Sequence, residues 1–143
     1  MNKQNFYDLN FDQLKNFLIE KINVDTNKAR MRAQQMFNAV YKKNIKNFDE
    51  LTTFSLELRD KIKDLISLAK PKIVDIQKSK DGTIKFLLEL KDKRNVETVL
   101  IPDKSQSRYT ICLSVSVGCY LSCEFCATAQ ISKKLVRNLS PGE

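Results

Sequence analysis

The sequence predicts an α+β fold: a small helical region, then antiparallel strands, then a last part, a strand followed by a loop, that holds every cysteine of the chain. Three observations support this prediction. Apolar residues recur at helical spacing over residues 1–70, alternating segments with turn signals follow over 71–107, and all four cysteines lie within 108–143. We therefore expect three parts: a helical domain, a strand-rich linker and the beginning of a further domain.

The composition is that of a basic protein without a membrane-spanning signal. The 143 residues include 25 Lys and Arg against 17 Asp and Glu, which gives a net charge of +8. A basic surface suits a polyanionic partner, although charge alone does not distinguish RNA from any other polyanion. No apolar run approaches the ~18 residues that a membrane span needs, so we expect a monomeric cytoplasmic protein without a membrane partner.

Three amphipathic helices are predicted in the first 70 residues. Asp8 or Asn10 can cap the first helix, and Thr26 can cap the second. Ser55 precedes the third helix, which Pro71 should end. The apolar positions should form the core of a small bundle. They are Phe11, Leu14, Leu18 and Ile22, then Ala29, Ala33, Met36, Phe37, Val40 and Tyr41, then Leu58, Ile62, Leu65, Ile66 and Ala69.

Basic side chains gather on the polar face of the second helix and just after it. They are Lys28, Arg30, Arg32, Lys42, Lys43 and Lys46. Each of them taken alone is explained by solvent exposure. As a set they could contact the phosphates of a nucleic acid, and both interpretations stay open at this point.

An antiparallel meander is predicted between residues 71 and 107. Asp81–Gly82 is a hairpin signal that separates a strand over Lys72–Gln77 from one over Thr83–Leu90. A further strand, Val96–Ile101, should end at Pro102. The sequence therefore predicts three consecutive strands between the helices and the cysteines.

The last part of the chain should begin with a buried strand. Tyr109–Val117 is apolar and rich in β-branched residues, and Gly118 then allows the backbone to turn into the cysteine loop. Ser140 and Glu143 have the spacing of a capping box, with Pro141 at the first helical position. A helix should therefore begin at residue 141.

Three cysteines carry the main chemical signal. Cys119, Cys123 and Cys126 have the spacing C-x3-C-x2-C. Three thiolates can hold three irons of a four-iron cluster and leave the fourth open to a small molecule, whereas an electron-carrying cluster normally has four cysteine ligands. A structural zinc site is an alternative, although such sites usually pair two Cys knuckles and this sequence has no His. Unliganded thiols also stay open, and disulfides are disfavoured because no signal peptide is visible.

These cysteines and their neighbours resemble a known family. C-x3-C-x2-C with Phe125 before the last Cys resembles the radical S-adenosylmethionine (SAM) superfamily. The segments Val96–Pro102, Ser-Val-Ser-Val-Gly-Cys over 114–119, Phe-Cys-Ala-Thr-Ala over 125–129 and Arg137-Asn138-Leu139 are similar to the RlmN-type adenine-C2 RNA methyltransferases and their Cfr-type relatives. The likeness extends more weakly through the helices.

The resemblance implies a fold and a set of cofactors. Residues 1–70 would be an accessory RNA-binding domain similar to a helix-hairpin-helix module, and residues 109–117 the first strand of a partial (β/α) barrel. Cys119, Cys123 and Cys126 would bind a 4Fe-4S cluster, and Phe125 would contribute to cofactor binding. An electron donor of the flavodoxin type would reduce the cluster.

The resemblance also implies a reaction that uses two SAM molecules. One methylates a C-terminal Cys, and the other is cleaved at the open iron to start radical transfer of that methyl group to C2 of adenine. Large-subunit rRNA and tRNA would be the substrates. Glu97 matches the family's proton acceptor, although an outward-facing strand residue is the simplest interpretation from spacing alone. Cys112 matches the cysteine that releases the product through a transient disulfide.

The sequence departs from the family in one large respect. No Cys follows Cys126, so the methyl-carrying Cys is not present, and most of the barrel is missing as well. We therefore expect an N-terminal fragment that is inactive alone. Two alternatives stay open: a non-catalytic RNA-binding fragment, and a Cfr-type enzyme that methylates C8.

Overall fold

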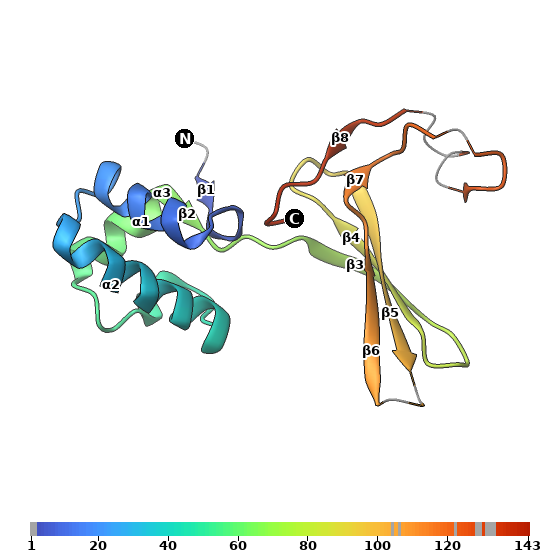
Figure 1. Ribbon diagram of the computed structural model, residues 1–143, viewed down its shortest axis with the longest axis horizontal. Coiled ribbons are helices and arrows are strands. Elements are labelled where there is room, and N and C mark those ends of the chain that lie inside the picture. The colour runs from blue at the N-terminus through green and yellow to red at the C-terminus, as the bar shows by residue number, and fades with distance from the viewer. Residues whose placement is uncertain (1–2, 104, 106, 122, 128–129, 131–133) are drawn as a thin grey trace. The chain divides into compact units, whose positions relative to one another are not determined.

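The computed structural model describes residues 3–143 except 104, 106, 122, 128–129 and 131–133. The chain divides into two compact units (Figure 1). The first is Met1–Ala69 with Gly142, and the second is Lys70–Pro141 with Glu143. Among the described residues, no helix combines the length and apolar character that crossing a membrane requires.

The first unit is helical, as the apolar periodicity predicts. Its elements in chain order are β1 (Gln4–Asn5), η1 (Phe6–Asp8), α1 (Phe11–Glu20), α2 (Thr26–Phe37), the π-helical turn η2 (Asn38–Lys42), η3 (Phe48–Glu50), α3 (Leu56–Leu65) and β2 (Ile66–Ser67). The three predicted α-helices are confirmed (Figure 1).

Side-chain caps fix where the helices begin. Asn10 and Gln13 form a capping box, in which each side chain accepts the other's backbone N–H at 2.9 Å. The prediction that Thr26 caps α2 is wrong. Asp25 is the cap, and its carboxylate accepts the N–H of Asn27 at 2.7 Å. A charged acceptor is well suited to this place because a helix N-terminus is positive.

The predicted end of the third helix is also wrong. The helix stops at Leu65 instead of continuing to Ala69, because Ile66 adopts an extended conformation with φ −119° and ψ 144°. Ile66 begins β2, which pairs in parallel with β1, and the Ile66 side chain is buried. Pairing with a strand from the other end of the unit therefore overrides the local helical pattern.

The core of the first unit is apolar and closely packed. Its fully buried side chains come from every layer of the unit and are Phe6, Leu14, Leu18, Met36, Ile62 and Ile66. Aromatic rings extend this core, since Phe6 contacts Phe37 with ring centroids 5.4 Å apart and Phe37 contacts Tyr41 at the same distance. Burial of these groups is the main source of stability for the unit.

The second unit is built on an antiparallel sheet of order β3-β4-β5-β6. Its strands are β3 (Lys72–Lys78), β4 (Ile84–Glu89), β5 (Asn95–Asp103) and β6 (Arg108–Leu113), followed by the short antiparallel pair β7 (Ser116–Val117) and β8 (Arg137–Asn138). The predicted hairpin at Asp81–Gly82 is confirmed. Gly82 has φ +95°, and Asp81 accepts the N–H of Thr83 at 2.9 Å.

Two strand predictions are wrong. The strand expected to be buried over Tyr109–Val117 is shorter, and all six residues of β6 are exposed. Pro102 does not end β5 but pairs with Tyr109 of β6. The pairing of β5 with β4 stops at Leu100, so Pro102 lies where β5 has only one neighbour and its missing N–H leaves no gap in a ladder.

We expect the substitution Leu18→Ala to destabilise the helical unit by about 2–5 kcal/mol, since it removes a fully buried side chain and leaves a cavity. Urea unfolding followed by far-ultraviolet circular dichroism measures this change. Leu56→Ala is the matched control, because Leu56 is 70% exposed and its loss should cost less than about 0.5 kcal/mol. Equal losses in the two variants would contradict the assigned core.

Candidate active site

Glu97 and Cys112 lie on one face of the sheet. Cys112 of β6 is directly opposite Val99 of β5, and Glu97 is two residues from Val99 on the same strand. Side chains at paired positions, and at positions two apart, leave the same face. Glu97 and Cys112 are therefore diagonal neighbours, a relation that puts their Cα atoms about 7–8 Å apart. Both residues are exposed, and the Cys112 thiol is free.

Lys85 joins this pair and is a residue that the sequence reasoning missed. It lies opposite Val99 on the other neighbouring strand, β4, and its Nζ is 3.0 Å from Glu97 Oε1. An exposed ion pair of this kind contributes at most about 1 kcal/mol to stability. Its main effect is to orient the Glu97 carboxylate, and the alternation of the strand containing Lys85 is the only sequence signal for it.

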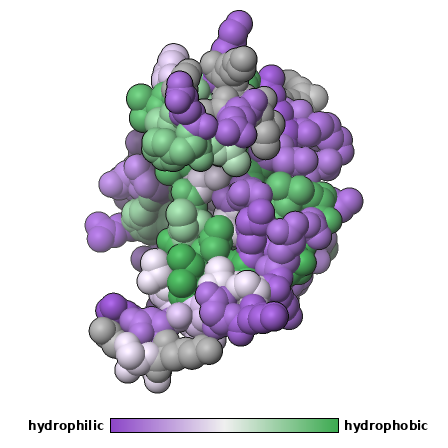
Figure 2. Space-filling model, turned by 90° about the vertical axis from the view of Figure 1, so that its right-hand side faces the viewer, coloured by the Kyte–Doolittle hydropathy of each residue, from purple (hydrophilic) through white to green (hydrophobic). Residues whose placement is uncertain are grey.

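The opposite face of the sheet is apolar. Ile84 of β4, Leu100 of β5 and Ile111 of β6 form one row across it. Ile111 and its neighbours Tyr109 and Leu113 on β6 are each more than half exposed. Figure 2 shows apolar and polar side chains intermixed on one side of the molecule. The two faces differ in character, and the chemically reactive groups are on the polar one.

The backbone connects this face directly to the cysteines. Beyond β6, the N–H and hydroxyl of Ser114 both donate to the Glu97 carbonyl, at 3.3 and 2.8 Å. The chain then enters β7 and turns at Gly118, whose φ of +77° confirms the predicted turn. The Ser116 hydroxyl donates to the Gly118 carbonyl at 3.0 Å and braces the turn. Cys119 follows immediately.

The cysteine segment, residues 119–126, has the donors that a thiolate cluster needs but does not gather them. Cys119, Cys123 and Cys126 are half-buried, and none of the three is in a disulfide bond with a described residue. Cys119 Sγ accepts the N–H of Leu121 at 3.4 Å, and the N–H of Cys126 donates to the Cys123 carbonyl at 3.1 Å. Within the described residues, no three His, Cys, Asp or Glu side chains converge on one metal position.

The chemistry of this donor set nevertheless fits an iron–sulfur cluster. It offers three thiols on one short segment, and one of them already accepts a backbone N–H, as cluster sulfurs commonly do. Phe125, assigned to cofactor binding by resemblance, is 91% exposed beside Cys126. The predicted ligand and cofactor roles of these residues stay predictions.

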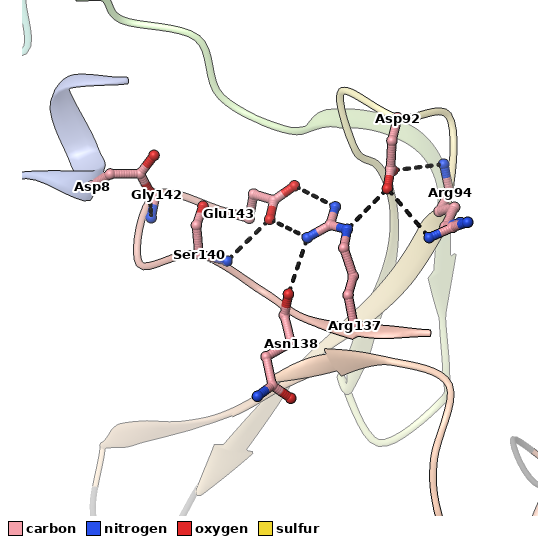
Figure 3. A network of polar contacts seen from close by, with 8 residues as sticks. All are labelled: Asp8, Asp92, Arg94, Arg137, Asn138, Ser140, Gly142 and Glu143. Carbon is pink, nitrogen blue, oxygen red and sulfur yellow. Dashed lines mark hydrogen bonds and ion pairs between the residues drawn. The ribbon is translucent and has the colours of Figure 1, made fainter. Parts of the chain in front are cut away.

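A charged network anchors the strand that pairs with β7 (Figure 3). Arg137 of β8 donates from Nη1 and Nη2 to the Glu143 carboxylate at 2.6 and 2.7 Å, and from Nε to Asp92 at 2.9 Å. These hydrogen bonds hold the pKa of Glu143 below its usual 4.5 and that of Asp92 below its usual 3.8. They also raise the pKa of Arg137, which stays charged.

The same network explains the outcome of the predicted capping box. Glu143 does accept the N–H of Ser140, at 3.0 Å, as the box requires. The helix expected from residue 141 stays a prediction, because the sequence includes only residues 141–143 of it, and among these Pro141 and Gly142 form a turn. The N–H of Glu143 donates back to the Ser140 carbonyl at 3.0 Å and closes this turn.

The helical unit presents a basic surface that is smaller than predicted. The exposed side chains are Lys28, Arg30, Lys42, Lys43 and Lys46, and none of them forms an ion pair with a described residue. Arg32 does not belong to this surface. Its guanidinium lies 4.8 Å from the centre of the Phe54 ring and donates to the Thr53 carbonyl at 3.0 Å, so its role is structural.

Comparison with known proteins shows that the resemblance to RlmN-type methyltransferases extends along the chain. Residues 4–68 match the family model described as Ribosomal RNA large subunit methyltransferase N-terminal domain. The dual-specificity RNA methyltransferase RlmN of Campylobacter fetus subsp. fetus is 40% identical over 98% of this chain and 40% of the relative. That of Oleidesulfovibrio alaskensis is 41% identical over 94% of this chain and 36% of the relative. The chain is therefore similar to the N-terminal region of the RlmN-type radical-SAM RNA methyltransferases.

A solved structure shows the same similarity and supports the predicted fold class. The crystal structure of a radical SAM methyltransferase from Sphaerobacter thermophilus matches with a TM-score of 0.79 and 33% identity. The match covers 98% of this chain and 39% of that chain. Helices combined with an antiparallel sheet, as predicted, are thus the fold of this region. The chain spans about two fifths of the length of the curated relatives it matches.

The Arg137 network should lose its stabilising effect as the pH is lowered. Because the pKa values of Asp92 and Glu143 are lowered on folding, the stabilisation is complete above pH 4.5. It is lost as the pH falls through the lowered values, which lie below 4.5 for Glu143 and below 3.8 for Asp92. We expect the Arg137 Nε–H resonance, followed by ¹⁵N NMR, to be unchanged down to pH 4.5 and to disappear below pH 3.8. Loss of the resonance already above pH 4.5 would contradict the network.

Proposed function

We propose that this chain is the N-terminal part of an enzyme that methylates C2 of adenine in large-subunit rRNA and tRNA. The observation that carries the proposal is the shared sheet face of Glu97 and Cys112, with the cysteine segment following along the same chain. The printed names of the relatives, which are dual-specificity RNA methyltransferases, support the substrate class.

Each residue on this face has a distinct proposed role. Glu97 would accept the proton lost from the target carbon, and Lys85 would hold the Glu97 carboxylate in place for that task. The Cys112 thiolate would attack the sulfur that carries the transferred carbon, so that a disulfide forms as the carbon–sulfur bond breaks. The released carbon would keep the bonding electron pair and take up a proton to become the methyl group. The second cysteine would come from polypeptide outside these 143 residues.

Cys119, Cys123 and Cys126 would hold a 4Fe-4S cluster, with Phe125 at the edge of the cofactor site. When bound, the cluster and two SAM molecules would supply the radical chemistry, with electrons from a flavodoxin-like donor. The 143 residues alone would bind iron without completing methyl transfer. The spacing of the three thiols supports this assignment, since three thiolates on one short segment can hold three of the four irons.

Two other functions compete with this proposal. A Cfr-type enzyme directed at C8 would share the same cluster segment, so the identity of the methylated adenine separates the two. A non-catalytic RNA-binding fragment is favoured by one observation, namely that the three thiols do not converge within the described structure. Binding of iron is the property that distinguishes the fragment from the enzyme.

We expect anaerobic reconstitution with iron and sulfide to give about four irons per chain and the visible absorption of a 4Fe-4S cluster. Replacing Cys119, Cys123 or Cys126 singly by Ala should abolish both. Cys112→Ala is the matched control, because this exposed thiol lies on the sheet and should leave the iron content unchanged. Little stable iron in the unaltered chain would favour the non-catalytic alternative.

The basic surface of the helical unit should bind RNA electrostatically. We expect the triple variant Lys42→Gln, Lys43→Gln and Lys46→Gln to weaken binding of a large-subunit rRNA fragment and to reduce the salt slope by about 0.7–0.9 per lost phosphate contact. Fluorescence anisotropy over a series of salt concentrations measures both effects. The control is Lys61→Gln, which removes a lysine already paired with Glu57 at 2.7 Å. An equal loss in the control would contradict a localised site.

A further inference from the structure

We propose that Arg137 is a positioning residue for the cysteine segment. The inference rests on the proposed function, in which that segment binds the cluster. Arg137 does not belong to the ligand set or to the Glu97 face. Its guanidinium instead ties together β8, the turn between β4 and β5, and Glu143, as Figure 3 shows. These connections determine the position of Cys119, the first residue of the cysteine segment.

Hydrogen bonds from Arg137 to Glu143, Asp92 and Asn138 hold its side chain in one orientation, and we call this network the clamp. The two Nη atoms of Arg137 form a bidentate pair with one carboxylate, Nε donates to a second, and Nη1 also donates to the Asn138 carbonyl at 3.1 Å. The side chain of Glu143 is only 16% exposed, in contrast to 78% for Glu57 in a surface pair. Reduced exposure weakens solvent screening, so this network holds its parts more firmly than a surface pair does.

The clamp reaches Cys119 through a short ladder. Arg137 itself pairs with Val117 of β7, and the N–H of Val136 donates to the Val117 carbonyl at 2.9 Å. The N–H of Leu139 donates to the Val115 carbonyl, also at 2.9 Å. A pair of two-residue strands is marginal by itself and needs a tertiary anchor. Arg137 provides that anchor, and Gly118 and Cys119 follow the anchored strand directly.

The other end of the clamp is on the strand pair that carries Glu97. Asp92 lies in the turn that joins β4 to β5, and Glu97 is in β5. The network therefore fixes the start of the cysteine segment to the same hairpin that holds the proposed proton acceptor. Misplacement of reacting groups by about 1 Å can cost on the order of 100-fold in rate, so such a link has functional value.

Hydrogen exchange of the apo chain tests the clamp without any cofactor. In Arg137→Gln we expect the Val136 and Leu139 amides to exchange about tenfold faster, while amides of the β4–β5 ladder keep their rates. Arg137→Lys keeps the positive charge but loses the planar guanidinium that donates from several nitrogens, and it should give an intermediate exchange rate. Arg108→Gln, which breaks an ion pair with Asp103 at the far end of β5, is the control and should change neither amide. Unchanged exchange in Arg137→Gln would overturn the proposal.

Iron binding tests the link to the cluster. After anaerobic reconstitution, Arg137→Gln should hold less than about half of the iron of the unaltered chain and show a broadened electron paramagnetic resonance spectrum on reduction. Arg137→Lys should recover part of both, and Arg108→Gln should match the unaltered chain. Full iron content with an unaltered spectrum in Arg137→Gln would overturn the positioning role. If the unaltered chain binds no iron, the proposed function fails, and the exchange experiment still decides whether the clamp exists.

Discussion

The register of β5 against β6 is the constraint on which the candidate site depends. Pairing of Val99 with Cys112 puts Glu97 and Cys112 on one face, and a slip of one residue would move one of them to the other side of the sheet. The different character of the two faces agrees with this register, since Ile84, Leu100 and Ile111 share the apolar face. Sheet pairing, rather than any local motif, brings the proposed proton acceptor and the Cys112 thiol together.

Three kinds of contact extend this frame towards the cysteines. Lys85 orients Glu97 from the neighbouring strand, and Ser114 ties the departing chain to the Glu97 carbonyl. The Arg137 network then holds the β7–β8 ladder against the turn before β5. The candidate site is thus a framework of paired strands that holds Glu97 and Cys112 at fixed places. The helical unit has its own core and its own basic surface.

Local patterns in the sequence predicted most of the elements, while non-local contacts account for what the sequence could not show. Helix starts were visible because caps such as Asn10 act within one turn. The end of α3 was not, because Ile66 pairs with a strand more than sixty residues earlier in the chain. Lys85 and the bond from Arg137 to Asp92 were missed for the same reason. The exposure of β6 was mispredicted because apolar composition shows what can be buried, not which neighbour covers it.

The most direct test of the central claim is a graft. Residues 1–143 would replace the matching region of the Campylobacter fetus relative, and nucleosides of large-subunit rRNA incubated with the reconstituted chimera would be analysed by mass spectrometry. The account predicts 2-methyladenosine, lost on Glu97→Gln or Cys112→Ala and retained in the control Glu89→Gln. A chimera that binds iron and RNA but makes no 2-methyladenosine, or one that stays active without Glu97 and Cys112, would contradict it.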